Sequence, residues 1–142
     1  MKVYLTEIGA RESGHVILGA GSVLRDLSSL GSDILVLANG ESMIRLLDEN
    51  TPEARQKLTD RFSVFALNRG IYDQLRYIDE TGMEVVRVNY KAGKISVVPQ
   101  NQLQDKSQRY YFKDTFALGN GEVFSSPLDL NVENKKIETP YK

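Results

Sequence analysis

Apolar residues recur at alternating steps of four and three along the first part of the chain, from residue 16 to residue 37. This spacing keeps apolar side chains on one stripe of a helix, so it predicts a single long helix. Three further apolar residues, Ile17, Leu24 and Leu35, widen the stripe. We therefore expect the helix to pack on its own domain and also against a second copy of the chain. The stripe consists of Val16, Ala20, Val23, Leu27, Leu30, Ile34 and Leu37.

Two shorter helices are predicted to follow. Residues 39–40, an Asn-Gly pair, interrupt the long stripe, and the apolar residues within 43–47 predict a short helix. Thr51 and Pro52 then provide an N-cap and a first-turn proline for a third helix. Gly70 is expected to end that helix in a left-handed conformation. The buried face of the third helix is expected to hold Ala54, Leu58, Phe62 and Phe65.

The residue types then change from helix formers to aromatic and β-branched residues, with turn residues at short intervals. This pattern predicts three strands, at residues 72–79, 83–90 and 95–98. The turns between them, at 80–82 and 91–94, are short. Short turns join antiparallel neighbours, so we expect a meander.

Side chains alternate in the second predicted strand. Val86, Val88 and Tyr90 fall on one face, and Arg87 and Asn89 fall on the other. Because this alternation is typical of a sheet with one buried face, we expect helices to cover one side of the sheet.

The last part of the chain predicts shorter elements. Residues 105–118 predict a helix and 122–126 a strand. Two further strands, at 128–132 and 136–138, flank a turn at Asn134. Helices followed by antiparallel strands predict the α+β class.

Length and composition agree with this class. The chain has 142 residues and a mass of 16.0 kDa, and 41% of its residues are hydrophobic. That is enough to form one buried core. We expect a single domain over residues 1–142, with a helical part in 1–70 and a sheet part in 71–142.

Charge and residue usage exclude several classes of function. The net charge is −1, whereas proteins that bind nucleic acids carry a cationic surplus that neutralises phosphates. The absence of cysteine excludes disulfides, thiol nucleophiles and zinc sites built from thiolates. The most apolar run, residues 15–24, is far shorter than the roughly 20 residues that cross a bilayer. Glu7 and Glu12 precede it, so we expect neither a signal peptide nor a membrane span in this sequence.

Signals for catalysis are weak. His15 is the only histidine, and it lies among apolar residues at the start of the predicted long helix. The sequence has no Gly-rich phosphate loop after a strand, no His or Asp cluster with metal-ligand spacing and no Gly-x-Ser-x-Gly elbow. We therefore expect no enzymatic activity, no metal and no cofactor.

The strongest candidate for ligand binding is the run Arg-Tyr-Tyr-Phe at residues 109–112. A guanidinium holds a carboxylate through two parallel hydrogen bonds, and tyrosines line a pocket while offering a hydroxyl group. This combination suits a small anion or zwitterion. The alternative is that the aromatic residues belong to the core and that Arg109 pairs with Asp105 or Asp114 at the surface. The residues alone leave both interpretations open.

Four other polar residues have a functional and a structural interpretation. Asp129 near Arg109 would receive a ligand's ammonium group, or it caps a turn. Tyr72 and Arg76 either line a pocket or take part in ordinary cross-strand contacts. Asp79 lies at a predicted turn, which favours a structural role.

Four segments occur in order along the sheet part: YDQLRYID at 72–79, Gly82 with EVVR at 84–87, RYYF at 109–112 and GEVFSSPLDLN at 121–131. Their combination resembles the extracytoplasmic Cache sensor domains of bacterial receptors, also called PDC or PAS-like domains. The resemblance is strongest to the membrane-distal half of double-Cache sensors in histidine kinases and diguanylate cyclases. It covers roughly residues 16–142.

The resemblance implies a long N-terminal helix that rises from a membrane anchor, and an antiparallel PAS-like sheet whose one face forms a ligand pocket. It implies a periplasmic location in an inner-membrane receptor and a homodimer. Amino-acid-binding members carry an Arg-x-Trp-Tyr pattern; Arg109 matches its arginine, and Tyr111 and Phe112 stand at the Trp and Tyr positions. The resemblance and the residue types together predict a ligand site that comprises Arg109, Tyr110, Tyr111, Asp129, Tyr72 and Arg76.

Members of this family usually continue beyond the final Pro-Tyr-Lys segment into two more strands. We therefore expect the sheet to lack its last strands and to leave an interior strand unpaired. Such a strand would seek a second copy, by direct pairing or by exchange of elements. The leading hypothesis is a sensor that binds a carboxylate or an amino acid. The alternative is a spacer of the same shape that dimerises receptors and binds no ligand.

Overall fold

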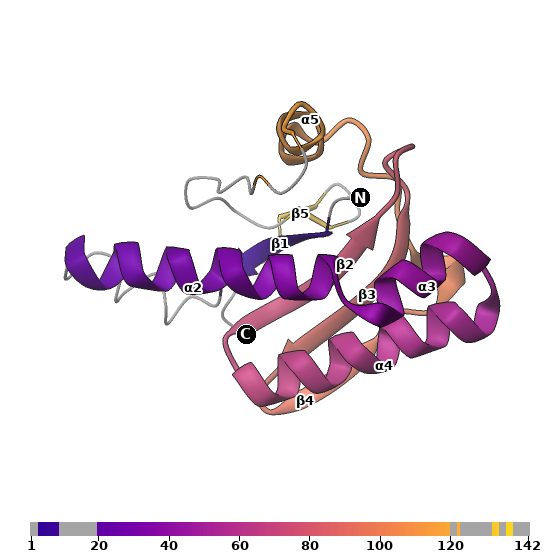
Figure 1. Cartoon of the computed structure of the whole chain (residues 1–142), viewed down its shortest axis with the longest axis horizontal. Coiled ribbons are helices and arrows are strands. Elements are labelled where there is room, and N and C mark those ends of the chain that lie inside the picture. The colour runs from indigo at the N-terminus through magenta and orange to yellow at the C-terminus, as the bar shows by residue number, and fades with distance from the viewer. Residues whose placement is uncertain (1–2, 9–19, 120–121, 123–131, 134–135, 138–142) are drawn as a thin grey trace.

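The computed structural model describes residues 3–8, 20–119, 122, 132–133 and 136–137, with side-chain surroundings for 29–119 and 122. Its helices are α2 (Ala20–Ala38), α3 (Glu41–Glu49), α4 (Pro52–Arg69), the short 3₁₀ helix η1 (Gln100–Gln102) and α5 (Tyr110–Phe116). Its strands are β1 (Val3–Ile8), β2 (Tyr72–Ile78), β3 (Glu84–Lys91), β4 (Lys94–Val97), β5 (Val132–Glu133) and β6 (Lys136–Ile137). These elements confirm the predicted α+β class (Figure 1).

The helix α4 forms where the sequence predicts it. Thr51 Oγ1 accepts a hydrogen bond from the amide of Ala54 at 3.1 Å, so Thr51 caps the helix as expected. Pro52 occupies the first turn, where the missing N–H has no helical partner to lose. Gly70 adopts a left-handed conformation with φ of 67° and donates to the carbonyl of Ala66 at 2.9 Å, which ends the helix.

The strands β1 to β4 form one antiparallel sheet in the order β1-β2-β3-β4. The strands β2, β3 and β4 make the predicted meander. The strand β1 was not predicted, and it corrects the expectation that residues 1–70 form a purely helical part. The pairing of Val3 with Tyr77 shows why: the partner strand lies far along the chain. Local residue patterns identify strands poorly when the stabilising contacts are this distant.

The position of β1 also changes the expected edges of the sheet. It pairs with one side of β2, while β3 pairs with the other side. Within the described residues β2 is therefore not an unpaired interior strand, and the outer strands of the sheet are β1 and β4.

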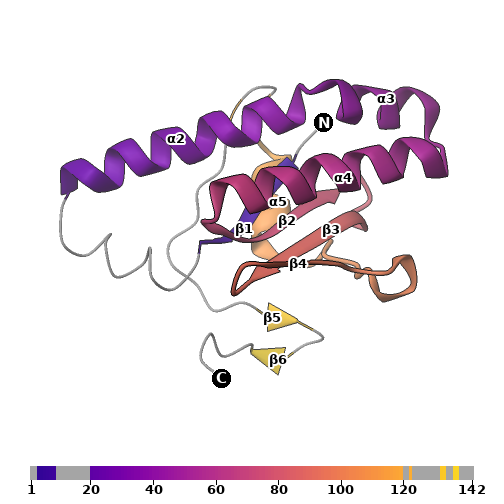
Figure 2. The same ribbon diagram turned by 90° about the horizontal axis from the view of Figure 1, so that it is seen from below.

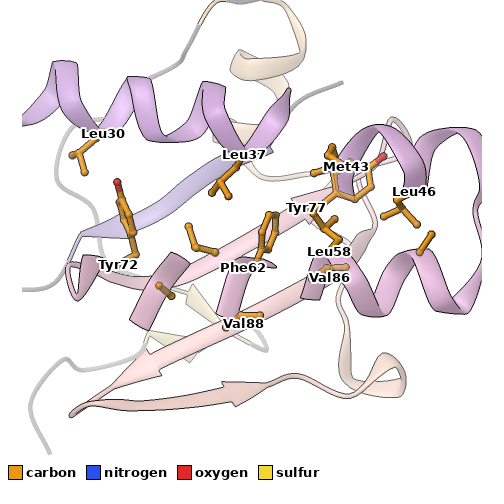
Figure 3. Packing of buried hydrophobic residues seen from close by; sticks show 13 residues of the cluster. Leu30, Leu37, Met43, Leu46, Leu58, Phe62, Tyr72, Tyr77, Val86 and Val88 are labelled. Atoms are coloured by element: carbon orange, nitrogen blue, oxygen red, sulfur yellow. The ribbon is translucent and has the colours of Figure 1, made fainter. Parts of the chain in front are cut away.

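Helices cover one face of the sheet, which we call the helix face (Figure 2). The helix α4 lies along β2 and β3, and α2 and α3 extend the helical layer beside it. The core between the layers contains side chains from all three helices and from β2 and β3 (Figure 3). Burial of Leu30, Ile34 and Leu37 confirms that the long helix packs on this sheet. The labelled core residues are Leu30, Leu37, Met43, Leu46, Leu58, Phe62, Tyr72, Tyr77, Val86 and Val88.

An irregularity in β3 changes which residues share a face. Tyr77 pairs with Val86, but the next residue, Ile78, pairs with Glu84, so Val85 is an extra residue in β3. An extra residue in one strand of a pair inverts the alternation beyond it. Glu84 consequently lies on the face opposite to Val86, although simple alternation places the two on the same face.

The segment that precedes α5 runs beside the start of β3. The amide of Glu84 donates to the carbonyl of Gln104 at 3.0 Å, and the amide of Lys106 donates to the carbonyl of Gly82 at 2.7 Å. These bonds extend the sheet by a short stretch of chain. The helix predicted at 105–118 is therefore shorter, and α5 begins at Tyr110.

The C-terminal strands β5 and β6 pair with each other in an antiparallel arrangement. Of the strand predicted at 128–132, only Val132 is described, and the predicted turn residue Asn134 lies outside the described residues. Residues 123–131, which include most of the strand predicted at 122–126, lie outside the described part of the chain. So do residues 16–19, the predicted start of the long helix. Among the described helices, none has the length and apolar character that crossing a membrane requires.

Candidate functional site

The sheet face opposite the helices, here called the far face, carries buried polar residues instead of an exposed polar surface. Gln74 and Arg76 of β2 alternate with core residues and lie on this face. Arg87 pairs directly with Arg76 across the strands and is also buried. The helices α2, α3 and α4 cover the helix face, as predicted, but the polar side chains of the far face are buried as well. We call Gln74, Arg76, Glu84 and Arg87 the far-face cluster.

An ion pair between Arg76 and Glu84 is the centre of this cluster. Arg76 Nη1 lies 2.6 Å from Glu84 Oε1, and both side chains are 0% exposed. Arg76 Nη2 donates to Gln74 Oε1, and the amide of Gln104 donates to Glu84 Oε2 at 2.9 Å. Buried charges are tolerated only when such partners replace water. The pair therefore fixes β2, β3 and the segment before α5 to one another.

Two more cations lie close to this ion pair in the fold. Arg87 Nη1 is 3.8 Å from Glu84 Oε1, and Arg87 Nε donates to Asn89 Oδ1 at 3.2 Å. Lys106 is buried, and its Nζ donates to Gln104 Oε1 at 3.0 Å. Each cation is thus held in a fixed position by oxygen atoms of neighbouring side chains.

Arg109 lies at the N-cap position of α5, and its guanidinium lies near two aromatic rings. Its Cζ atom is 5.3 Å from the ring centroid of Tyr111 and 6.0 Å from that of Tyr110. The Arg109 Nε atom is buried, and no described residue accepts a hydrogen bond from it. Neither Asp105 nor Asp114 forms an ion pair with Arg109 among the described contacts, so the alternative interpretation of a surface ion pair finds no support there.

The carboxylate of Asp105 has a different partner. Its Oδ1 accepts a hydrogen bond from the amide of Ser107 at 2.8 Å. This bond to the backbone of Ser107, together with a contribution from its side chain, lowers the pKa of Asp105. Asp105 therefore shapes the turn before α5 and leaves Arg109 to its aromatic neighbours.

Aromatic side chains around Arg109 are only partly enclosed. The rings of Tyr110 and Tyr111 meet edge to face, with centroids 5.6 Å apart. Phe112 and Phe116 form a second pair, also at 5.6 Å. Tyr110 and Phe116 are exposed, so these two rings do not belong to the hydrophobic core formed by the described residues.

The other predicted site residues are Tyr72, Arg76 and Asp129, and the two described ones lie on opposite faces of the sheet. Tyr72 lies on the helix face, where its hydroxyl donates to Asp33 Oδ2. The pKa of Tyr72 is raised mainly because its side chain is buried, and also because of this hydrogen bond. Arg76 lies on the far face, so β2 separates the two side chains. Asp129 is outside the described residues.

Asp79 has the structural role that its turn position indicates. Its Oδ1 accepts hydrogen bonds from the amides of Thr81 at 2.9 Å and Met83 at 3.1 Å. These bonds close the turn between β2 and β3.

Sequence reasoning missed several residues of the far face as members of one cluster. Glu84, Arg87 and Lys106 come from two segments that pair only in the folded chain. A charged residue inside each of two neighbouring strands is a signal for such a cluster. The register and the extra residue Val85 are also needed, and the sequence specifies neither.

Comparisons with known proteins identify the fold family. A family model described as "Bacterial histidine kinase, sensor domain" matches residues 25–142. The chain belongs to this family. The sensor domain is not itself an enzyme, in agreement with the weak catalytic signals. No curated protein sequence matches the chain.

Two solved structures are similar to this sensor domain. One is a domain of a putative sensory box/GGDEF family protein from Vibrio parahaemolyticus, with a TM-score of 0.74 and 26% identity over 92% of this chain. The other is the extracellular domain of the putative histidine kinase vpHK1S-Z8, with a TM-score of 0.73 and 26% identity over 84% of this chain. The chain spans 50% and 42% of those two solved chains. The predicted similarity to receptor sensors is confirmed.

Proposed function

We propose that this chain is the extracytoplasmic, ligand-sensing part of a membrane-bound receptor and that it binds a small carboxylate or amino acid. Arg109 serves as the anion clamp, and Tyr110 and Tyr111 form the walls of the site. Asp129 is the proposed partner of a ligand's ammonium group. The observation that carries the proposal is the guanidinium of Arg109, which lies within 6.0 Å of the centroids of two tyrosine rings and has no carboxylate partner among the described residues.

The chemistry of this arrangement favours an anion with a flat charged group. A guanidinium binds a carboxylate through two parallel hydrogen bonds, and the charge makes each bond stronger than a neutral one. The faces of Tyr110 and Tyr111 stabilise the cation before a ligand arrives. Tyr110 is exposed and Tyr111 is partly exposed, which supports access of small molecules to Arg109.

Arg76 and Tyr72 take supporting roles in this proposal. Arg76 stabilises the far face through its ion pair with Glu84. Tyr72 acts from the helix face, through its hydrogen bond to Asp33. The direct ligand contacts therefore centre on residues 109–111.

The proposal also includes a location and an assembly for this chain. The similar histidine kinase structure is named as an extracellular domain, which supports a periplasmic position for this chain. The parent protein is then an inner-membrane histidine kinase or diguanylate cyclase of a signal-transduction system. A homodimer formed through the long helix or by exchanged elements is part of the proposal.

Ligand titration tests the proposed clamp. The full chain is screened by thermal shift against carboxylates and amino acids, and each hit is measured by calorimetry. In Arg109→Ala we expect the affinity to fall by about tenfold to a hundredfold, because a hydrogen-bonded charge pair contributes roughly 1.5–3 kcal/mol. Arg61→Ala is the matched control, since Arg61 is exposed on α4. Unchanged affinity in Arg109→Ala would remove the clamp from the proposal.

A spacer module that binds no ligand is the second candidate. It is favoured by the ion pair of Arg76 with Glu84, in which buried charges neutralise each other without a ligand. If none of the carboxylates or amino acids changes the melting temperature of the chain, the spacer function is the better explanation.

A further inference from the structure

Polar side chains tie the long helix α2 to the start of the sheet. Asp33 of α2 accepts hydrogen bonds at Oδ2 from the hydroxyl of Tyr72 and from Nε of Arg69, the latter at 2.9 Å. Arg69 Nη2 also donates to Ser29 Oγ at 3.1 Å. We call Ser29, Asp33, Arg69 and Tyr72 the helix–sheet junction.

The junction joins three elements at one point. Arg69 is the last residue of α4 and Tyr72 is the first residue of β2, so the two donors stand on either side of a tight connection. The buried contacts of α2 in this region are apolar, through Leu30, Ile34 and Leu37. Apolar contacts are not directional and tolerate small shifts of a helix. Hydrogen bonds to one carboxylate oxygen define one position of the helix along the sheet.

Of the two donors to Asp33, Tyr72 is the one that is shielded from water. Its side chain is enclosed, with 1% of the residue exposed, and its ring stacks on Phe65 with centroids 6.1 Å apart. The hydroxyl of Tyr72 is protonated at neutral pH, and burial and the hydrogen bond to Asp33 raise its pKa further. Arg69 is 41% exposed, so water and salt weaken its pair with Asp33.

One strand connects this junction with the far face. Tyr72 begins β2 on the helix face, and Arg76 follows in the same strand on the far face, paired with Glu84. A shift of β2 therefore acts on both sides of the sheet at once.

We propose that the hydrogen bond between Tyr72 and Asp33 is the contact through which a change in the position of β2 moves the long helix α2. Asp33 is a positioning residue: it transmits a displacement and contacts no ligand. That a ligand initiates the displacement rests on the proposed function. The coupling of the helix to the strand does not, and it is measured without ligand.

Spin-label distances test the coupling directly. The full chain has no cysteine, so two introduced cysteines take the labels without background. Val36→Cys on α2 with Lys94→Cys on β4 reports the position of the long helix, and all three of Val36, Lys94 and Val64 are exposed. Val64→Cys on α4 with Lys94→Cys reports whether the rest of the helical layer stays in place.

Tyr72→Phe and Asp33→Asn are the test variants, and Tyr77→Phe is the matched control. Tyr77 is a buried tyrosine of the same strand and belongs to the same core, outside the junction. We expect both test variants to shift the α2 distance by about 1–2 Å or to broaden it, as in helix shifts that transmit signals. The α4 distance is expected to stay unchanged, and Tyr77→Phe to change neither distance.

Two results would overturn the proposal. The first is an α2 distance in Tyr72→Phe and Asp33→Asn that equals that of the parent chain. The second is an equal change in both label pairs, because that reports loss of the fold and not release of one helix. Neither result depends on whether a carboxylate binds near Arg109, so the two proposals fail separately.

Discussion

Single residues in this sensor domain differ widely in what their charges contribute. Arg76 and Glu84 are both 0% exposed and form a direct ion pair. Arg45 and Glu49 form an ion pair of similar length at 3.0 Å, but on the exposed surface of α3. Removing one partner from a buried pair leaves a charge without compensation, whereas water replaces a lost partner at the surface. An ion pair therefore affects the free energy of unfolding much more at the buried site than at the exposed site.

Glu84→Ala and Glu49→Ala compare these two environments directly. We expect Glu84→Ala to lower the free energy of unfolding by about 3–5 kcal/mol, because Arg76 then keeps a buried charge without its carboxylate. Glu49→Ala is expected to lower it by about 0.5 kcal/mol or less. Urea denaturation followed by circular dichroism measures both. Equal losses in the two variants would contradict the assigned role of the buried pair.

At the scale of elements, the start of α5 depends on a segment that is attached to β3. The amide of Lys106 donates a hydrogen bond to the carbonyl of Gly82, and the next residue, Ser107, packs closely against that glycine. Gly82 has a positive φ of 90°, and a Cβ atom there would lie 2.5 Å from the Cα of Ser107. Only glycine permits both the turn and this close approach. The position of Arg109 thus depends on a glycine in a different turn.

Gly82→Ala tests this dependence, with Gly93→Ala as its control. Gly93 also has a positive φ, of 76°, but a Cβ atom added there would meet no atom within 4 Å. The control should lose about 1–2 kcal/mol of unfolding free energy from backbone strain alone. We expect a further loss of about 1–3 kcal/mol in Gly82→Ala, because Ser107 has to move. Thermal denaturation of the two variants measures the difference, and equal losses would show that the contact with Ser107 is unimportant.

At the scale of the whole molecule, the outer strand on one side of the sheet comes from the N-terminal end of the chain. The strand β1 pairs with β2 and separates it from the edge. Without β1 the backbone donors and acceptors on that side of β2 have no strand to pair with. Free edges of this kind pair readily with other chains.

Deletion of residues 1–8 should therefore increase self-association. The shortened chain exposes one side of β2, and a second copy is expected to supply the missing strand partner. Light scattering over a range of concentrations measures the association of the shortened and intact chains side by side. An unchanged association constant would mean that β1 does not protect this edge.

The sequence alone determined the class of the fold and the course of its most regular parts. Periodicity located α2, α3 and α4, cap residues marked the ends of α4, and turn residues separated β2, β3 and β4. These signals are local, because each depends on residues within a few positions of one another. The motif segments also indicated the sensor family that the comparison confirmed.

Only the tertiary structure decided which of the candidate residues lie together. It placed Tyr72 and Arg76 on opposite faces of one strand, and it joined Arg76 to Glu84 through an irregular register. It also added β1, whose partner is distant in sequence. The physical reason is common to these cases: register and long-range pairing are set by packing over the whole sheet, and no short stretch of sequence contains that information.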